Sequence, residues 1–251
     1  MELGGICVKG ARLLLSRNRG AMKTAYKIQL VAADEPECGA SRPCWVGAHP
    51  LLGNRLAAAA LARGLLAPIL GAHSAVRAEA MHGHMRVDFE LTHAAAAGAS
   101  CGSSTLLEIK NVVCSDYLPS SDAPKAPKRY KLVYANVAPD GGVYSRSAVF
   151  PVGKRCQKLE DDTVVVSERA IKHLRELSQL KSSSTKTAVL FVVNRADCER
   201  VCLLNSSCAV FGREAQAAAA AGVALLAFLV RWVGGAAYFN GVIPVDAAAV
   251  S

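Results

Sequence analysis

Two short stretches decide the fold: R-V-D-F-E at residues 86–90 and L-E-I-K at residues 107–110. Each alternates apolar and polar residues with a period of two, the pattern of a β-strand whose successive side chains point to opposite faces. The alternation predicts that Asp88 faces away from the core, and that Glu108 and Lys110 share an outward face. The residues predicted to lie beneath them are Val87, Phe89 and Leu91 in the first strand and Leu107 and Ile109 in the second.

A carboxylate on each of two neighbouring strands indicates a site for a divalent metal. Mg²⁺ and Mn²⁺ take oxygen ligands and often keep waters, so a phosphate oxygen can complete their shell. Lys110, on the same face as Glu108, can orient a water or stabilise charge that develops on the phosphate. We therefore predict that Asp88 and Glu108 are metal ligands and that, with Lys110, they act in phosphodiester hydrolysis. The alternative is that the three side chains are solvated or pair with each other.

The first seventy residues have the pattern of a small β module followed by a helix. Strands are predicted at residues 11–15, 25–32 and 44–46, and a helix at 54–66 with Asn54 as its N-cap. From Val76 onward the sequence alternates polar and apolar residues and carries more charged positions. This change predicts a domain boundary near residue 70, giving units 1–70 and 71–251. Residues 115–162 are rich in Pro, Ser, Gly and Lys, which predicts a long insertion or lid.

The C-terminal half predicts a mixed sheet flanked by helices. Ser167 is expected to cap a helix with Ile171, Leu174 and Leu177 on its inner face, while Lys172 and His173 lie on its exposed side. Glu168 and Lys172 are spaced for an i, i+4 ion pair. A strand at 187–194, a helix at 213–221 and a strand at 223–230 follow, and two strands joined through a helix favour parallel pairing.

Composition narrows the class of protein. The chain of 251 residues carries 29 Lys and Arg against 20 Asp and Glu, a balance that favours polyanionic partners. Nine cysteines, an odd number, and an opening segment without a signal sequence favour a reducing compartment, with cytoplasm, nucleus and organelle stroma left open. The longest apolar run, residues 215–230, is too short and too interrupted to span a bilayer, so we expect a soluble protein.

The motifs together resemble the sugar fermentation stimulation protein A family over nearly the whole chain. Its acidic residue, S-R-I-D-F and E-V-K pattern is similar to Glu79, to Arg86-Val87-Asp88-Phe89 and to Glu108-Ile109-Lys110. Further matches are Trp45-Val46-Gly47, Asn54-Arg55-Leu56, Phe150-Pro151 and the helix Arg169–Leu177. The family's first strands have no counterpart before Gly10, so an N-terminally truncated member is expected. Its R-K-T-x-Y stretch is Met22-Lys23-Thr24-Ala25-Tyr26 here, and its Gly before the K-H pair is Ala170.

The resemblance implies an α/β protein with a partial OB-like β module and a mixed-sheet domain like the PD-(D/E)XK nucleases. It implies DNA as partner and Mg²⁺ or Mn²⁺ as cofactor, with single or double strand and a possible dimer left open. Glu79 is expected as an additional catalytic acid, with an ion pair to Arg77 or Arg86 as the alternative. The residues expected to contact DNA are Lys23, Tyr26, Arg86, Lys172 and His173.

The sequence is therefore compatible with three functions. The first is a DNA-binding protein with a Mg²⁺-dependent nuclease-like site. The second is a non-catalytic DNA-binding regulator that uses the same cleft to bind phosphate. The third is a structural or interaction protein with a degenerate site, which would show no salt-dependent affinity for DNA.

Overall fold

A mixed six-stranded sheet lies at the centre of the computed structural model, which describes residues 3–20, 23–33, 44–95, 102–116, 145–153, 157–203 and 208–247. The strands run in the order β13-β12-β10-β6-β5-β4. Their bounds are β4 Ala75–His82, β5 Met85–Thr92, β6 Ser104–Val112, β10 Thr185–Val193, β12 Ala224–Val233 and β13 Ala236–Ile243. The two stretches that the sequence marked as strands, in β5 and β6, are neighbours in this sheet.

The middle of the sheet is parallel and its flanks are antiparallel. β10 pairs in parallel with β6 on one side and with β12 on the other. Helix α4 (Ala209–Ala220) connects β10 to β12 after the short strand β11 (Arg200–Cys202), so the predicted parallel pairing is confirmed. Seven consecutive residues of β10, Thr187–Val193, are buried, as expected of a strand covered on both faces.

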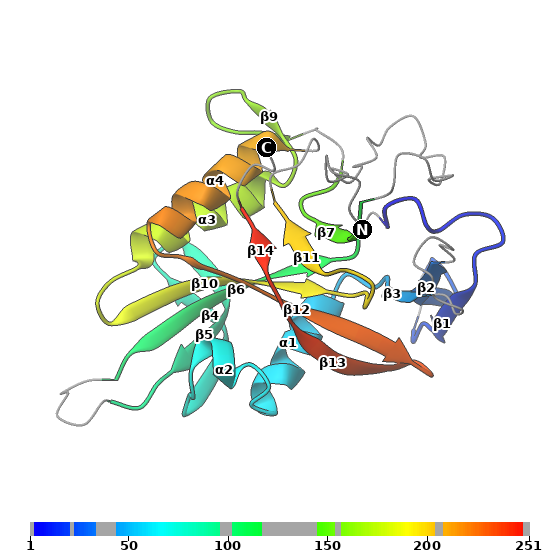
Figure 1. Ribbon diagram of the computed structural model, residues 1–251, viewed down its shortest axis with the longest axis horizontal. Helices are drawn as coiled ribbons and strands as arrows, with labels where there is room; N and C mark the ends of the chain where they lie inside the picture. Colours follow the sequence, from blue (N-terminus) through cyan, green and yellow to red (C-terminus); the bar gives the residue numbers. More distant parts are fainter. Residues whose placement is uncertain are drawn as a thin grey trace.

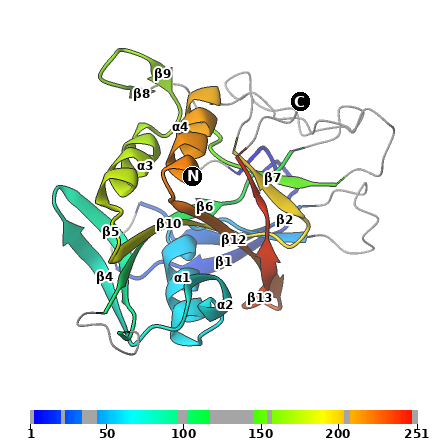
Figure 2. The ribbon, with the colours of Figure 1, turned by 60° about the vertical axis from the view of Figure 1, so that its left-hand side comes forward.

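Helices cover the sheet on both faces, as Figures 1 and 2 show. Helices α3 (Glu168–Leu180) and α4 pack on one face, and α1 (Leu52–Ala62) and α2 (Ala67–Leu70) pack on the other. The predicted inner residues Ile171, Leu174 and Leu177 of α3 are buried in the first of these two cores. Because both faces are covered, a polar residue on a central strand lies inside the protein, and alternation alone does not place it in solvent.

Three antiparallel strands form a separate N-terminal sheet in the order β1-β2-β3. Their bounds are β1 Leu13–Arg17, β2 Tyr26–Ala33 and β3 Cys44–Gly47, which confirms the predicted small β module. The Gly47 N–H donates to the Asn194 carbonyl at 2.8 Å, and a Cβ on Gly47 would lie 2.6 Å from the Asn194 side chain. This close approach ties the module to the end of β10.

Two smaller sheets complete the described structure. β7 (Ser147–Val149), β11 and β14 (Val245–Asp246) form a parallel sheet, and β8 (Gln157–Lys158) pairs with β9 (Val164–Val165). The predicted insertion at 115–162 thus contains strands of its own, while residues 117–144 and 154–156 of it lie outside the described residues. The boundary near residue 70 stays a prediction; α1, before that boundary, packs on the central sheet.

Of the two predicted helix caps, the structure confirms the position of one. Helix α1 begins at Leu52, so Asn54 lies inside its first turn and is not the N-cap. Ser167 does occupy the N-cap position of α3, but in a left-handed conformation and without a side-chain cap bond. The Gln157 side chain accepts the hydrogen bond from the Glu168 N–H at 2.8 Å instead. At α3 a contact from a distant strand has thus replaced the local cap that the sequence favoured.

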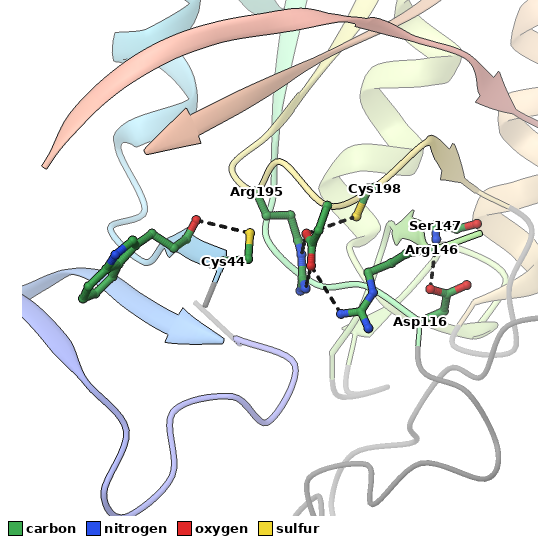
Figure 3. A network of polar contacts seen from close by, with 8 residues as sticks. Cys44, Asp116, Arg146, Ser147, Arg195 and Cys198 are labelled. Atoms are coloured by element: carbon green, nitrogen blue, oxygen red, sulfur yellow. Dashed lines mark hydrogen bonds and ion pairs between the residues drawn. The ribbon is translucent and has the colours of Figure 1, made fainter. Parts of the chain in front are cut away.

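A buried ion pair braces the junction between β10 and the β7 sheet (Figure 3). Both oxygens of Asp197 accept hydrogen bonds from the guanidinium of Arg195, each at 2.6 Å, and Arg146 lies 3.4 Å from the same carboxylate. Arg195 is fully buried. Cys198 is a buried free thiol beside Asp197. No helix in the described parts of the chain is long and apolar enough to cross a membrane.

Candidate functional site

The β5–β6 ladder stops where the site begins. Its last paired residues are Phe89 and Leu107, so Asp88 and Glu108, next in register, do not form a backbone pair. The Asp88 carboxylate instead accepts a hydrogen bond from the Ile109 N–H at 2.7 Å. A side chain thus takes the place of a ladder bond, and the two strands separate at the two carboxylates.

The same position interrupts the pairing of β5 with β4. The ladder omits Glu79 and Asp88, and Glu79 adopts a left-handed backbone with φ of 55°. Beyond this point β5 changes partners: Val87 packs in the core of α3 and α4, whereas Phe89 and Leu91 pack in the core of α1 and α2. The prediction that these three apolar residues share one face is therefore wrong, because the hairpin twists at Asp88.

Asp88 is held from two sides. Besides the Ile109 N–H, it accepts a hydrogen bond of 2.6 Å from the side-chain amide of Asn54 in α1. Burial and the negative charge of Glu108 raise the pKa of Asp88, and these two hydrogen bonds oppose the rise. Burial is the larger cause, and the contribution of the Glu108 charge shows that the two carboxylates lie close enough to repel each other.

Glu108 is almost fully buried beneath α3, with 4% of its surface exposed. Its Oε1 atom is the partner of both Lys110 Nζ, at 2.7 Å, and His173 Nδ1, at 2.6 Å. Burial acts to raise the pKa of Glu108, but the His173 hydrogen bond and the Lys110 charge outweigh it and lower the pKa. Its other oxygen, Oε2, is buried and has no hydrogen-bond partner among the described residues.

The predicted outward position of this face is wrong, because α3 covers it. The predicted exposure of His173 is wrong for the same reason: only 8% of the residue is exposed, and it lies on the inner side of α3. Arg169 Nε–H donates to His173 Nε2 at 3.2 Å, so we assign the ring proton to Nδ1, which donates to Glu108. Lys172 does lie on the exposed side, where it forms the predicted ion pair with Glu168 at 2.8 Å.

The remaining predicted site residues lie outside the cluster. Glu79 pairs with Arg86 at 2.8 Å, the alternative that the sequence left open, and both side chains are more than half exposed. Lys23 and Tyr26 are exposed on the N-terminal sheet, with 56% of Tyr26 accessible. Their expected contact with DNA stays a prediction. The structure thus brings together Asp88, Glu108, Lys110 and His173.

Asn54 is the functional residue that the sequence did not reveal. A polar residue ahead of a helical pattern resembles an N-cap, and nothing local relates it to an aspartate 34 positions later. Only the packing of α1 against the sheet creates the contact. The one available signal was that Asn54 falls in a motif of the family resemblance.

The donor set suits a hard cation with few protein ligands. Within the described residues, no three His, Cys, Asp or Glu side chains gather into a complete cage. Two carboxylates, one with a buried oxygen that lacks a partner, are what Mg²⁺ commonly receives from a protein, with waters and substrate phosphates completing the shell. The residues present therefore fit such an ion.

Comparison with known proteins gives consistent similarities. Residues 163–234 match the family described as the sugar fermentation stimulation protein RE domain. A sugar fermentation stimulation protein homolog of Thermosynechococcus vestitus is 29% identical over 89% of this chain and 73% of the relative. One from Trichodesmium erythraeum is 29% identical over 77% of this chain, which covers 58% of that relative. A third, from Rhizobium rhizogenes, is 27% identical over 98% of this chain and 78% of its own length.

A solved structure has the same fold. It is the structure of Pyrococcus furiosus SfsA in complex with Ca²⁺, which matches with a TM-score of 0.61 at 15% identity, over 92% of this chain and 76% of that one. The fold and the buried cluster define a mixed α/β protein with a paired-carboxylate site. The chain is thus similar in sequence and in fold to the sugar fermentation stimulation protein family.

Proposed function

We propose that this chain is a DNA-binding protein with a Mg²⁺-dependent, nuclease-like site formed by Asp88, Glu108 and Lys110. One observation carries the proposal: the buried Oε2 of Glu108 lacks a partner and belongs to a carboxylate that repels Asp88. A cation between the two carboxylates supplies the missing partner and removes the repulsion. Both unfavourable features are thereby resolved by one ligand.

A hard divalent cation is the ion of choice for this site. The Pyrococcus furiosus protein of the same fold was solved with Ca²⁺, which takes oxygen ligands as Mg²⁺ does. When bound, Mg²⁺ supplies Lewis-acid polarisation of a phosphoryl oxygen. Manganese is the alternative with the same ligand preference.

The protein's own groups orient the site. Asn54 and the Ile109 N–H fix both oxygens of Asp88, and His173 fixes Oε1 of Glu108. Lys110, with 12% of its side chain exposed, keeps an ammonium beside the carboxylates, where it stabilises negative charge that develops on a phosphate. The net basic charge of the chain favours the approach of DNA.

The proposal includes the fold of each part of the chain: a PD-(D/E)XK-like domain and a partial OB-like module. Two adjacent strands that present Asp, then Glu-x-Lys, in a mixed sheet with helices on both faces support a PD-(D/E)XK-like domain. The open three-stranded sheet β1-β2-β3 supports a partial OB-like module.

The second candidate is a non-catalytic DNA-binding regulator. Two observations favour it: Lys110 is already paired with Glu108, and the described residues offer two carboxylates rather than a complete cage. In this case the cluster binds a phosphate through its cation without hydrolysing it.

Cleavage of labelled single- and double-stranded DNA with Mg²⁺ tests the choice. We expect the wild type to cleave and Asp88→Ala and Lys110→Ala to lose on the order of 100-fold or more in rate. Glu214→Ala, which removes a partly exposed carboxylate on α4 paired with Arg175, is the matched control and keeps full activity. Thermal unfolding of each variant establishes that it is folded.

Calorimetric titration with Mg²⁺ provides a readout that does not depend on activity. Wild type is expected to bind the ion, and Glu108→Gln to bind it at least 10-fold more weakly. DNA binding without cleavage in the wild type overturns the enzyme and leaves the regulator. Absence of Mg²⁺ binding overturns the metal site itself.

A further inference from the structure

A polar pocket of about 390 Å³ opens on the N-terminal sheet, where β1 ends and turns toward β2. Its described lining residues are Ser16, Arg17, Asn18, Arg19 and Lys27, of which three are cations and none is an anion. Its volume falls in the range of about 300 to 1,000 Å³ that is usual for small-ligand sites.

The cations of this pocket lack counterions within the described structure. Arg17, Arg19 and Lys27 are exposed, and none forms an ion pair with another described residue. Between Leu3 and Ala33 the sequence has six Lys and Arg and no Asp or Glu. Three unneutralised cations around one hollow attract a multivalent anion.

The pocket is built on a fixed frame. Asn18 donates from its side-chain amide to the Thr24 carbonyl at 2.9 Å, and its backbone N–H donates to the Ala25 carbonyl at 2.9 Å. Ser16 accepts a hydrogen bond of 2.8 Å from Gln29. The hairpin therefore holds the arginines on either side of Asn18 in place, which reduces the entropy lost when an anion binds.

The positive charge continues from the pocket toward α1. Ala48, next to His49, donates its N–H to the Gln29 carbonyl of β2 at 2.7 Å, and the Leu51 N–H just ahead of α1 donates to His49 Nδ1 at 3.3 Å. Partial burial and the charges of Lys27 and Arg55 lower the pKa of His49, in keeping with this position between β2 and α1. Arg55 is exposed, and it follows Asn54, whose side chain holds Asp88. Basic groups thus connect the pocket, through Lys27 and Arg55, to the helix that touches the carboxylate cluster.

We infer that this pocket binds a backbone phosphate of a nucleic acid whose strand then runs past Lys27 and Arg55 to the carboxylate cluster. The path from the pocket past Lys27 and Arg55 is called the basic track, and its end at the carboxylate cluster rests on the proposed function. Guanidinium groups suit phosphate because their planar N–H donors match its oxygens. Tyr26, the residue before Lys27, is exposed on the opposite face of β2 and is not among the described residues that line the pocket.

The test compares two double variants of equal charge. Arg17→Gln/Arg19→Gln removes two pocket cations, and Lys186→Gln/Arg213→Gln removes two exposed cations from β10 and α4. Each is titrated with a labelled 16-nucleotide strand at several salt concentrations. Two lost contacts lower the slope of log affinity against log salt by about 1.4, since each phosphate contributes about 0.7 in a single strand. The matched pair leaves the slope unchanged.

Arg55→Gln is expected to lower the slope by about half as much, because it removes one cation of the track. Equal losses in the pocket and control pairs, or no loss in either, overturn the pocket. Inorganic phosphate that binds as tightly as the strand makes the pocket a small-anion site and overturns the nucleic acid as its occupant. Each variant's thermal midpoint, held at the wild-type value, excludes misfolding.

The outcomes separate this inference from the proposed function. DNA binding with the expected slopes but without cleavage supports the pocket and overturns the nuclease. Cleavage with unchanged slopes supports the nuclease and overturns the pocket. If cleavage occurs, the pocket pair should raise KM and leave the single-turnover rate at saturation unchanged. A wild type without affinity for nucleic acid overturns both.

Discussion

Two buried clusters of charge in this protein share their chemistry and differ in completeness. At Asp197 both carboxylate oxygens accept hydrogen bonds, one from Nε and one from an Nη of Arg195. At Glu108 one oxygen serves two donors and the other has no partner among the described residues. The carboxylate of the first cluster is satisfied by its arginine and braces the fold, whereas the carboxylate of the second has one oxygen without a described partner and faces a second carboxylate. The contrast marks which of the two awaits a ligand.

The largest predicted loss of stability follows from removing Arg195, because its ion pair with Asp197 is buried. Arg195→Met leaves Asp197 buried without its two-pronged partner, and breaking a buried pair in this way costs about 3 to 5 kcal/mol. We expect that loss in the free energy of unfolding, measured by urea denaturation. A loss below about 1 kcal/mol would mean that the pair is not buried in solution, and the contrast between the clusters would disappear.

Glu108→Gln should have an intermediate effect with a defined pH dependence. The pKa of Glu108 is lowered in the folded protein, so its charge adds stability that is fully present above pH 4.5 and is lost as pH falls through the folded value. We expect the variant to be less stable by about 1 to 3 kcal/mol at pH 7 without metal. The deficit should shrink in unfolding experiments carried out at progressively more acidic pH, and a deficit that grows would contradict the assignment.

Asp88→Asn should show the opposite sign. The pKa of Asp88 is raised, so its ionisation lowers stability as pH rises from the ordinary value of 3.8 through the folded one. An asparagine at position 88 has the same shape as the aspartate, and rotation of the Asn54 amide restores the hydrogen bond between residues 54 and 88. Without metal we expect the variant to match or exceed the wild type at pH 7, and to lose the advantage below pH 3.8. Mg²⁺ should stabilise the wild type and not the variant.

The smallest effect is expected at a surface pair of the same geometry. Arg175 donates two hydrogen bonds to Glu214, as Arg195 does to Asp197, but about half of the Arg175 side chain is exposed. Water and salt screen such a pair, so Arg175→Met should cost less than about 1 kcal/mol. Urea denaturation of both arginine variants under one set of conditions isolates burial as the difference between them.

The elements of the fold were largely predictable because their patterns are local. Alternation identified β5 and β6, a run of apolar residues identified β10, and the spacing of Ile171, Leu174 and Leu177 identified the inner face of α3. The parallel pairing of β10 with β12 followed from the helix between them. The face switch at Asp88 was missed, because a period of two assumes a strand that keeps its neighbours along its whole length.

The site itself was half predictable. Asp88, Glu108 and Lys110 were chosen correctly as neighbours from the parity of two strands. Asn54 and the inward position of His173 were not, since each depends on a helix reaching the sheet from a distant part of the chain. The basic pocket was missed as well, because its cations come from one strand end and from a second strand beyond the turn.

The sequence by itself determined the strands β5, β6 and β10 and the inner face of α3, and which two carboxylates lie side by side. Only the tertiary structure decided that Glu108 is buried under α3, that Asn54 and His173 hold the carboxylates, and that one oxygen is left without a partner. The reason is physical: strand parity is set by the local backbone, whereas burial and hydrogen-bond partners depend on which elements pack over that strand.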